Sequence, residues 1–460
     1  MEEFHWLWGT GPGFVVPAKS ITVLHEPRQY YELLKELSQK AQRRIILASL
    51  YLGTGELEKD LVKCVAEAVR QRQVKVHWLL DCTRGSRGGD NSSRSLLVPL
   101  VREFGQNVSG PGQERMRVSL YHTHHLRGPL RWILPARWNE VVGLTHLKVY
   151  LFDNTLMLSG ANLGDQYFVN RQDRYVVFHD CPALANFFAQ LVSVVASFSF
   201  QLQEDNSLAL QSGNQVHPYK GNSKEFARNA GSQLEALLMP NYHKEKTQIC
   251  AGDTWVFPLI QAGPFNIIQD QQVTERLLQT APKGSKIHLA TGYFNLTSRY
   301  AQMVQSNASC NFQLLLASPQ VNGFYGAKGA SGWIPTMYTW LARQFWEDLG
   351  QSRKHVAMAE YERPGWTFHS KGLWYQAAGQ NKPCLTLIGS PNFGHRSVHR
   401  DLEAQVAIVT ENPGLQEQLH QEQQRLWDLS RPVTQATFQA PDRHVPLWVR
   451  WVTPLLRNLF

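Results

Sequence analysis

The chain repeats one succession of buried segments. Each half has an apolar run that ends in a Gly or Asn turn, a second apolar run, a His-x-Lys segment, a Gly/Ser/Asn turn and a last apolar run. The matching pairs are 43–55 with 285–297, 74–81 with 311–319, and 173–178 with 403–409. Short apolar runs bounded by turn residues indicate buried strands, and helical patterns lie between them. This duplication restricts the fold to an α/β protein built from two similar halves.

We expect two pseudo-symmetric α/β/α halves, each with a mostly parallel or mixed sheet, and one active site at their interface. The length of 460 residues is sufficient for such a duplicated unit. Gln, Asn, Ser and Gly become frequent after position 204, which places the boundary there. The expected division is an N-terminal extension at 1–18, a first half at 19–204, a connecting segment at 205–252, and a second half with a C-terminal interfacial tail at 253–460.

The two His-x-Lys segments are the strongest candidates for catalysis. His146 and Lys148 precede Asp153 in THLKVYLFDN, and His369 and Lys371 lie in FHSKGLWYQ. Residues i and i+2 of a strand point to the same side, so each His shares a face with its Lys, whereas Asp153 has the opposite parity. An imidazole titrates near neutral pH and can act as nucleophile or proton carrier, and Lys charges suit phosphoryl oxygens.

This constellation resembles the phospholipase D superfamily, which carries paired H-x-K-x4-D motifs. The resemblance implies that one His attacks phosphorus to give a phosphohistidine and that the other acts as acid and then base. Superfamily precedent assigns the attack to His146 and the acid/base role to His369. The motif residues implied to be catalytic are His146, Lys148, Asp153, His369 and Lys371, with Glu403 beside them, and the turn residues implied to bind substrate are Ser159, Asn162, Ser390 and Asn392.

Two positions depart from the superfamily pattern. Gln376 stands where the second Asp is expected, and the first turn reads SGAN where Gly-Ser-x-Asn is usual. Because strand parity places this acid outside the site, Gln376 bears on local stability rather than on chemistry. Asp173, counted with the substrate-binding residues, and Glu403 occupy matching places downstream of the turns. We expect both carboxylates to orient an imidazole through its second nitrogen.

Longer strings narrow the resemblance. SGANLGDQYFVNRQDRY, LLASPQVNGFYGAKG and LIGSPNFGHRSVHRDLEAQ are similar to the eukaryotic mitochondrial phosphatidylglycerophosphate synthase family. That resemblance implies transfer of a phosphatidyl group from CDP-diacylglycerol to glycerol 3-phosphate with release of CMP, the committed step toward phosphatidylglycerol and cardiolipin. It also implies a peripheral location on the matrix side of the mitochondrial inner membrane. Cardiolipin synthase, phosphatidylserine synthase, a hydrolytic phospholipase D and a nuclease share the catalytic pair and stay open as alternatives.

A synthase must prefer glycerol 3-phosphate to water, which requires a second anion pocket near the catalytic pair. Arg suits bidentate binding of phosphate. Three short segments offer candidates, each with two arginines. These are Arg84 and Arg87 in TRGSRGG, Arg171 and Arg174 in NRQDR, and Arg396 and Arg400 in GHRSVHR.

Charge and cysteine usage restrict the partners. A net charge of +9 and a pI of about 9.2 favour anionic partners. No basic tract or aromatic single-strand platform supports nucleic-acid binding. The six cysteines lack a C-x-x-C pair, and HTHH at 122–125 lacks matching Cys or carboxylate ligands. We therefore expect no metal site and no required cofactor, with any divalent-cation effect acting through the charge of CDP-diacylglycerol.

Bilayer contact is expected to be peripheral. The uncharged stretch 183–203 has apolar residues at helical spacing on one side, which predicts a buried amphipathic helix and no membrane span. Segments 126–138, 324–340 and 447–460 mix Trp, apolar and basic residues, as suits an anionic membrane surface. The start, MEEFHWLWGTGPGF, is acidic where a transit peptide would be Arg-rich, so we expect no transit peptide in this chain.

Overall fold

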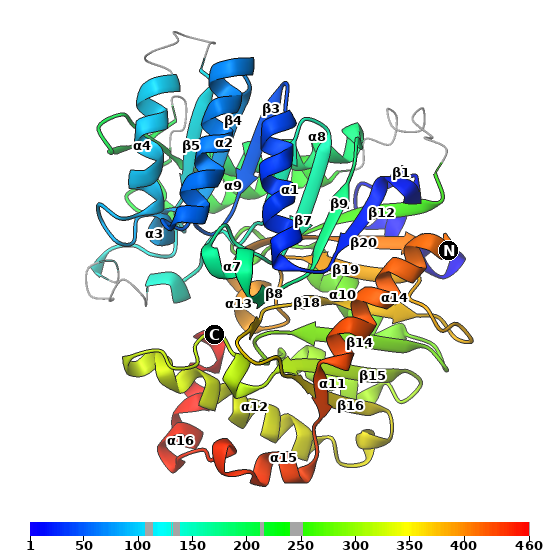
Figure 1. Cartoon of the computed structure of the whole chain (residues 1–460). Helices are drawn as coiled ribbons and strands as arrows, with labels where there is room; N and C mark the ends of the chain where they lie inside the picture. Colours follow the sequence, from blue (N-terminus) through cyan, green and yellow to red (C-terminus); the bar gives the residue numbers. More distant parts are fainter. Residues whose placement is uncertain (106–113, 130, 132–138, 212–215, 240–251, 460) are drawn as a thin grey trace.

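The computed structural model describes residues 1–105, 114–129, 131, 139–211, 216–239 and 252–459. Two α/β halves lie one above the other, the first coloured blue to green and the second green to red (Figure 1). Each half is built on one mixed sheet. The fold class expected from the duplication is therefore confirmed.

The sheet of the first half has the order β11-β10-β5-β4-β3-β6-β7-β9-β2. Its strands are β2 (Ile21–Leu24), β3 (Arg44–Ala48), β4 (Lys75–Asp81), β5 (Met116–Tyr121), β6 (Val149–Phe152), β7 (Thr155–Ser159), β9 (Tyr175–Phe178), β10 (Phe200–Leu202) and β11 (Leu208–Leu210). The pairs β3–β4 and β4–β5 are parallel, and the other neighbours in this sheet are antiparallel. The sheet is thus mixed rather than mostly parallel.

The sheet of the second half has the order β1-β12-β20-β19-β18-β14-β15-β16-β21. Its strands are β1 (Phe14–Val16), β12 (Thr254–Ala262), β13 (Ile267–Ile268), β14 (Lys286–Thr291), β15 (Asn311–Ala317), β16 (Val356–Tyr361), β18 (Lys371–Gln376), β19 (Leu385–Gly389), β20 (Leu402–Thr410) and β21 (Ser430–Pro432). The path β21-β16-β15-β14-β18-β19-β20-β12 matches β10-β5-β4-β3-β6-β7-β9-β2 strand for strand. The duplication read from sequence is therefore a duplication of topology.

Helices pack on both faces of each sheet. Those of the first half are α1 (Pro27–Lys40), α2 (Glu56–Arg72), α3 (Cys82–Gly85), α4 (Ser93–Phe104), α7 (Asp165–Val169), α8 (Pro182–Ser197) and α9 (Ser223–Leu238). Those of the second half are α10 (Gln269–Thr280), α11 (Ser298–Ser306), α12 (Ile334–Asp348), α13 (His395–His399), α14 (Pro413–Asp428), α15 (Gln435–Gln439) and α16 (Leu447–Leu456). Helices α1, α2 and α4 share one core with the first sheet, and α10, α11 and α12 share another with the second. A third core contains α8, α9, α14 and residues of both sheets, so the two halves share an apolar interior.

Helix α8 covers the uncharged stretch for which a membrane span was considered. Leu184, Phe188, Leu191 and Val195 lie on one side of it and are fully buried in the shared core. The prediction of a buried amphipathic helix is confirmed. Within the described residues, no helix combines the length and apolar character that crossing a bilayer requires.

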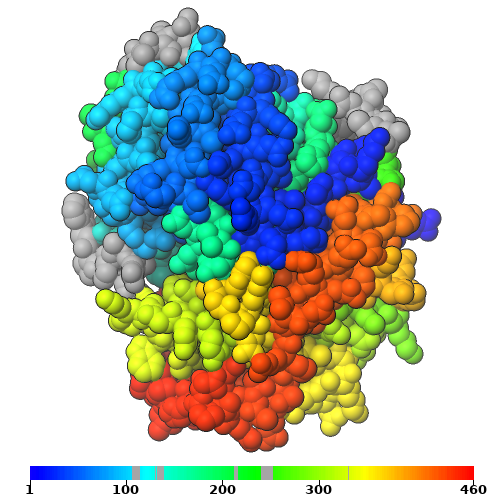
Figure 2. All heavy atoms as spheres, in the orientation of Figure 1, coloured from blue at the N-terminus to red at the C-terminus, as the bar shows by residue number. Residues whose placement is uncertain are grey.

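The first residues of the chain are built into the second half. Strand β1 pairs antiparallel with β12, with Phe14 opposite Val256, and Phe4 and Leu7 are buried in the core of the second half. In Figure 2 this blue N-terminal surface lies against the orange surface of the second half. The first sheet, in turn, continues to Leu210 in β11, past the expected boundary at 204.

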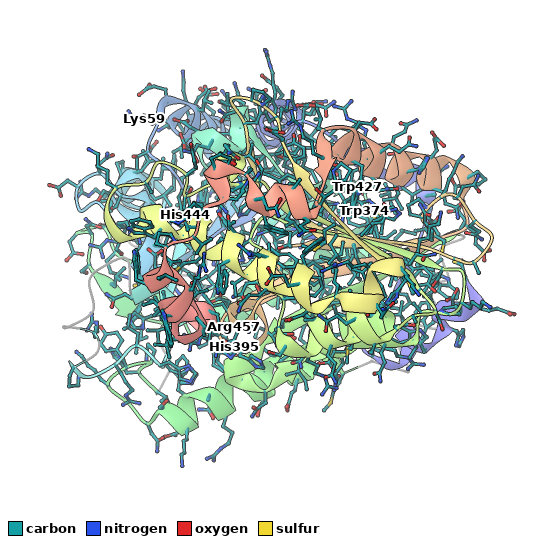
Figure 3. The ribbon with its side chains drawn as sticks, turned by 90° about the horizontal axis from the view of Figure 1, so that it is seen from below. Lys59, Trp374, His395, Trp427, His444 and Arg457 are labelled. Atoms are coloured by element: carbon teal, nitrogen blue, oxygen red, sulfur yellow. The ribbon has the colours of Figure 1, made fainter. Side chains whose placement is uncertain are left out.

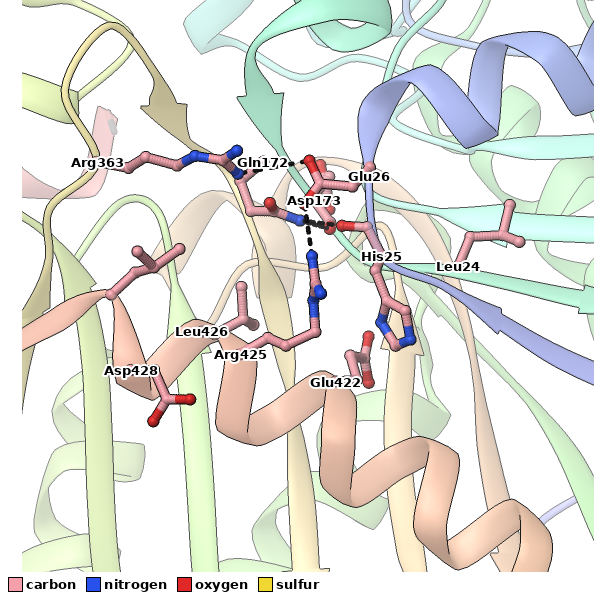
Figure 4. A pocket seen from close by; sticks show the side chains of 11 residues that line it. Leu24, His25, Glu26, Gln172, Asp173, Arg363, Glu422, Arg425, Leu426 and Asp428 are labelled. Atoms are coloured by element: carbon pink, nitrogen blue, oxygen red, sulfur yellow. Dashed lines mark hydrogen bonds and ion pairs between the residues drawn. The ribbon is translucent and has the colours of Figure 1, made fainter.

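Polar contacts join the halves along their seam. The short strands β8 (Arg171–Gln172) and β17 (Thr367–Phe368) come from different halves and pair in parallel. Glu26, at the start of α1, forms ion pairs with Arg363 and Arg425 of the second half, at 3.4 and 2.6 Å. These three side chains line a cavity of about 310 Å³ at the seam, with Asp173 at its wall (Figure 4). The site described next lies where these two halves meet.

Candidate active site

The first His-x-Lys segment immediately precedes β6 and faces the second half. His146 Nδ1 donates to Glu403 Oε2 at 2.9 Å, and Glu403 is the second residue of β20. The backbone N–H of His146 donates to the carbonyl of Leu402 at 2.7 Å. Glu403 also accepts hydrogen bonds from Ser390 Oγ and Ser397 Oγ, at 2.5 and 2.7 Å. The orientation of His146 is therefore set by the second half.

The second His-x-Lys segment repeats this arrangement in reverse. His369 Nδ1 donates to Asp173 Oδ2 at 2.6 Å, and Asp173 belongs to the first half. The backbone N–H of His369 donates to the carbonyl of Gln172 at 2.8 Å. The other oxygen of Asp173 accepts from the backbone N–H of Arg174 at 2.8 Å. The expected orienting roles of Asp173 and Glu403 fit these contacts, and each acid serves the histidine of the opposite half.

A carboxylate at Nδ1 determines which nitrogen of each imidazole can react. With the proton held on Nδ1, the lone pair lies on Nε2. The side chain of His146 is 12% exposed and that of His369 is 4% exposed. Both are therefore largely shielded from water, with Nε2 as the reactive atom.

Burial determines the charge of the site. Desolvation, reinforced by the neighbouring lysines, lowers the pKa of His146 and of His369 well below the usual histidine value. Desolvation also raises the pKa of the Glu403 and Asp173 carboxyls, although the two lysines oppose this. Both imidazoles are consequently neutral near pH 7, the form in which nitrogen can attack phosphorus or accept a proton.

The lysines lie beside their histidines, as strand parity predicts. Lys148 Nζ donates to the carbonyl of His146 at 2.8 Å, and Lys371 Nζ lies 3.5 Å from His369 Nε2. Desolvation lowers the pKa of each ammonium group, and the charges of Asp173 and Glu403 oppose this. Two buried lysine amino groups close to the two imidazoles provide hydrogen-bond donors for the oxygens of a phosphoryl group.

The serines of the two turns form hydrogen bonds within the protein. Ser159 Oγ donates to the carbonyl of Arg174 and accepts from the N–H of Ala161, at 2.6 and 2.9 Å. Ser390 Oγ donates to Glu403 and accepts from the N–H of Ala404. Both side chains are fully buried and their hydrogen bonds are used within the protein. These bonds connect each serine to the strand that carries an acid and engage its hydroxyl within the protein.

The asparagines of the turns differ from each other. Asn162 Nδ2 donates to Tyr167 OH at 3.0 Å, and Tyr167 OH lies 3.3 Å from His369 Nε2. Asn162 therefore acts on the site through Tyr167. Asn392 Oδ1 is buried and has no hydrogen-bond partner among the described residues. An acceptor left unpaired in this way costs free energy unless a ligand donates to it, so Asn392 remains a candidate for substrate contact.

Asp153 lies outside the site, which corrects its place in the catalytic group. The residue adopts a left-handed conformation with φ of 53° at the turn after β6. Its carboxylate accepts from the backbone N–H groups of Gln42, Arg43 and Arg44, at 2.8 to 3.0 Å. Gln376 takes the equivalent place at the end of β18, opposite Lys286. The parity argument was therefore right: this position supports the start of the neighbouring strand.

The six candidate arginines separate into different roles. Arg174 is excluded as a phosphate ligand because it is buried, forms a bidentate ion pair with Glu422 at 2.8 and 2.7 Å, and donates to Leu387 and Thr386. Four more have other described partners: Arg87 pairs with Glu140, Arg396 with Asp401, Arg400 with the carbonyl of Val141, and Arg84 lies over the ring of Tyr51. Arg171 has the neutral partners Thr367 and Tyr167, and it lies close enough to His369 for its charge to lower the pKa of that imidazole.

Two tyrosines of the site escaped the sequence reasoning. Tyr167 contacts His369 through its hydroxyl, and the ring of Tyr293 lies 5.5 Å from the imidazole of His369. Tyr167 lies just after the SGAN turn of the first half, and Tyr293 lies in TGYFNLT, at the end of the first apolar run of the second half. Their position next to turn residues was a usable signal, but a tyrosine there is equally consistent with packing.

The described residues contain no group of three His, Cys, Asp or Glu that could hold a metal ion. In the HTHH segment, His124 stacks on Phe265 with ring centroids 5.4 Å apart. Burial lowers the pKa of His124 to about 3. This histidine is a neutral core residue.

Comparisons with known proteins agree with the geometry. The chain is 48% identical to the human protein named CDP-diacylglycerol–glycerol-3-phosphate 3-phosphatidyltransferase, mitochondrial, over all of this chain and 86% of that one. It is 34% identical to the Saccharomyces cerevisiae protein of the same enzyme name, over 96% and 88%. A crystal structure of Haemophilus influenzae phosphatidylserine synthase has a TM-score of 0.76 at 19% identity, covering 98% and 97%. No family model matches the chain.

Two duplicated α/β halves with one His-x-Lys pair at their seam define a phospholipase D-type transferase. Full-length identity then decides the branch. The chain belongs to the family of CDP-diacylglycerol–glycerol-3-phosphate 3-phosphatidyltransferases, whose animal members are mitochondrial enzymes.

Proposed function

We propose that this enzyme transfers the phosphatidyl group of CDP-diacylglycerol to glycerol 3-phosphate, giving phosphatidylglycerophosphate and CMP. The observation that carries the proposal is the crossed pair of neutral imidazoles beside two lysines, in a chain with relatives of that name along its full length. This reaction is the committed step toward phosphatidylglycerol and cardiolipin.

In the first step, His146 Nε2 attacks the phosphorus that bears diacylglycerol. A nitrogen–phosphorus bond forms, the bond from that phosphorus to the CMP oxygen breaks, and CMP leaves. Glu403 stabilises the positive charge that develops on His146, since its carboxylate accepts a hydrogen bond from Nδ1 at 2.9 Å. The greater exposure of His146 supports its assignment as the nucleophile that meets the lipid phosphate.

In the second step, a hydroxyl of glycerol 3-phosphate attacks the same phosphorus. His369 Nε2 accepts the hydroxyl proton, a new oxygen–phosphorus bond forms, and the bond to His146 breaks. The low pKa of His369 keeps it unprotonated and ready to act as this base. Asp173 then shares the resulting charge through Nδ1.

Lys148 and Lys371 supply positive charge to the phosphoryl oxygens in both steps. No cofactor enters either step as written. A divalent cation would act on the diphosphate of CDP-diacylglycerol, whose charge it reduces.

The lipid substrate requires contact with a bilayer, and one surface suits it. Helix α16 exposes Leu447, Trp448, Trp451 and Leu455, at 46 to 80%. Trp333, which ends the 3-10 helix before α12, lies 4.8 Å from the ring of Trp448. We call these five residues the aromatic ridge. Segments 324–340 and 444–460 around the ridge contain Lys and Arg but no acidic residue, which favours an anionic membrane surface.

The aromatic ridge connects to the site through α12. Tyr338 of this helix stacks on Tyr293 with centroids 5.6 Å apart, and Tyr293 lies against His369. Arg457, directly after α16, neighbours His395 of α13 (Figure 3). We place the ridge on the matrix side of the mitochondrial inner membrane. Most of the third expected contact segment, 126–138, lies outside the described residues.

The activity is tested by product analysis. Vesicles with CDP-diacylglycerol are offered glycerol 3-phosphate, serine and water as competing acceptors, and CMP and lipid products are measured. Phosphatidylglycerophosphate as the main product is expected; phosphatidylserine or phosphatidic acid as the main product would contradict the proposal.

Membrane contact is tested by vesicle flotation of a Trp448→Ser/Trp451→Ser double variant on anionic and neutral vesicles. Loss of flotation on anionic vesicles is expected. Met239→Ser, which removes an equally exposed apolar side chain after α9, serves as the control. Unchanged flotation of the double variant would exclude the ridge as the main contact.

A further inference from the structure

Arg171 is a buried cation with an unusual set of neighbours. Its side chain is on β8, and the residue is 9% exposed. Nε donates to Thr367 Oγ1 at 3.0 Å, and the guanidinium lies over the ring of Tyr167 at 4.7 Å. Among the residues the structure describes, no carboxylate lies within ion-pair distance of it. By contrast, Arg174, three positions later, forms an ion pair with the carboxylate of Glu422.

A buried guanidinium without a carboxylate is costly unless an anion binds to it. The other cations of the site are balanced differently, because Lys148 and Lys371 face Asp173 and Glu403, and Arg396 pairs with Asp401 at 3.2 Å. Arg171 is therefore the cation most in need of an external anion in the described part of the site. Its planar donors suit a phosphate group in particular.

The guanidinium of Arg171 and the hydroxyl of Tyr293 both approach the backbone closely at Gly323. A Cβ atom built on Gly323 would lie 3.1 Å from Arg171 Nη2 and 3.2 Å from Tyr293 OH. Two hydrogen-bond donors from different halves thus lie within about 3.2 Å of one point beside Gly323, which brings them close to each other. Tyr293 also contacts His369, the proposed base for the attacking hydroxyl.

We propose that Arg171 and Tyr293, whose donor groups meet beside Gly323, bind the phosphate group of the acceptor, glycerol 3-phosphate. This inference rests on the proposed transferase function. The two histidines and two lysines surround the phosphorus being transferred, whereas Arg171 lies on the side of His369, where the acceptor hydroxyl must arrive. Water carries no phosphate, so it cannot satisfy Arg171, and a site built around an unmet charge rejects acceptors that lack the matching group.

The location also couples acceptor binding to base strength. The positive charge of Arg171 lowers the pKa of His369. A phosphate dianion on Arg171 offsets that charge, so His369 becomes a stronger base when the acceptor is present. The other groups that face His369 are Asp173, which favours its charged form, and Lys371, Lys148 and His146, which disfavour it, with Tyr167 and Tyr293 as neutral neighbours.

Arg171→Gln is tested with glycerol 3-phosphate and with glycerol, which has the hydroxyl but no phosphate. We expect KM for glycerol 3-phosphate to rise about 10- to 100-fold, the effect of losing charge-assisted hydrogen bonds. KM for CDP-diacylglycerol and CMP release without acceptor are expected to stay near wild-type values, and kcat/KM for transfer to glycerol is expected to change far less than kcat/KM for transfer to glycerol 3-phosphate. Arg70→Gln, which breaks a surface ion pair with Glu103, is the control.

Two further variants guard against misfolding. Tyr293→Phe keeps the ring on His369 and removes only the hydroxyl, so a smaller rise in the same KM is expected, about 3- to 10-fold. Gly323→Ala places a methyl group against both donors and should act in the same direction. In Arg171→Gln the acid limb of transfer to glycerol should move to higher pH, because removing a nearby positive charge raises the pKa of His369 and its neutral form is the active one.

The outcomes separate two failures. Wild-type protein that makes no phosphatidylglycerophosphate would overturn the proposed function and this assignment together. An active wild type with Arg171→Gln impaired equally for glycerol and glycerol 3-phosphate would overturn the acceptor site alone. A raised KM for CDP-diacylglycerol would instead place Arg171 on the donor phosphate and equally contradict the assignment.

Discussion

The two halves share a strand order but surround their histidines differently. In both, the histidine donates its backbone N–H to the residue before the opposite acid, and Nδ1 to the acid itself. His146 has a glutamate held by two serines, whereas His369 has an aspartate and two adjacent tyrosines. The backbone frame was thus retained after duplication, while the side chains near each Nε2 diverged. The same backbone contacts with different neighbouring side chains suit two histidines that act in two different steps of the reaction.

Replacing each histidine by alanine should give the largest difference between the two halves, because each variant loses a different step of the reaction. His146→Ala is expected to lose about 10⁶-fold in CMP release, since it removes the nucleophile. His369→Ala is expected to retain CMP release and to lose transfer to glycerol 3-phosphate by about 10²–10⁴-fold. Mass spectrometry of trapped protein should find phosphatidyl groups on His146 in that second variant. Phosphate on His369 in wild-type protein would reverse the assignment.

Replacing the two acids tests the crossing itself. Asp173→Asn and Glu403→Gln should each lower activity by about 10²–10⁴-fold, because without the carboxylate the ring proton can move from Nδ1 to Nε2, which then has no lone pair with which to react. Asp173→Asn is expected to impair the second step and Glu403→Gln the first, as pre-steady-state CMP release would show. The reverse pattern would mean that each acid serves its own half.

The seam between the halves should respond to Arg174→Met. This change leaves Glu422 buried without its cation, so the free energy of unfolding should fall by about 3–5 kcal/mol. Arg70→Met, which breaks an exposed pair with Glu103, should cost less than about 1 kcal/mol. Denaturant unfolding measures both. Equal small losses would show that the buried pair does not hold the halves together.

The smallest effect on activity is expected at the matching positions Asp153 and Gln376, where the two halves carry different residues. Asp153→Ala leaves three N–H groups ahead of β3 without an acceptor and should cost about 1–3 kcal/mol of stability. Gln376→Ala, with no described hydrogen bond from its side chain, should cost less. Catalytic rates of the folded fraction should be unchanged in both. A rate loss in Asp153→Ala at constant stability would return Asp153 to the chemistry.

Local pattern was enough to predict much of this protein. Apolar runs and their repetition predicted both sheets, and the alternation of a strand predicted that His and Lys share a side and that Asp153 does not. The pairing of each acid with the opposite histidine was beyond reach, because spacing along a chain says nothing about which half an outward-facing residue meets. The ion pair of Arg174 could not be predicted for a related reason: its partner Glu422 is distant in sequence and resembles any glutamate on a helix surface.

Strand β1 gives the order of synthesis a consequence. Its residues are translated before the strand they pair with, which begins at Thr254. The acid that orients His146 is made later still, at position 403. A growing or prematurely ended chain therefore carries a histidine without its acid and an unpaired first strand. The complete pair of histidines and acids therefore exists only after residue 403 has been translated, so a chain that ends before it lacks the full site.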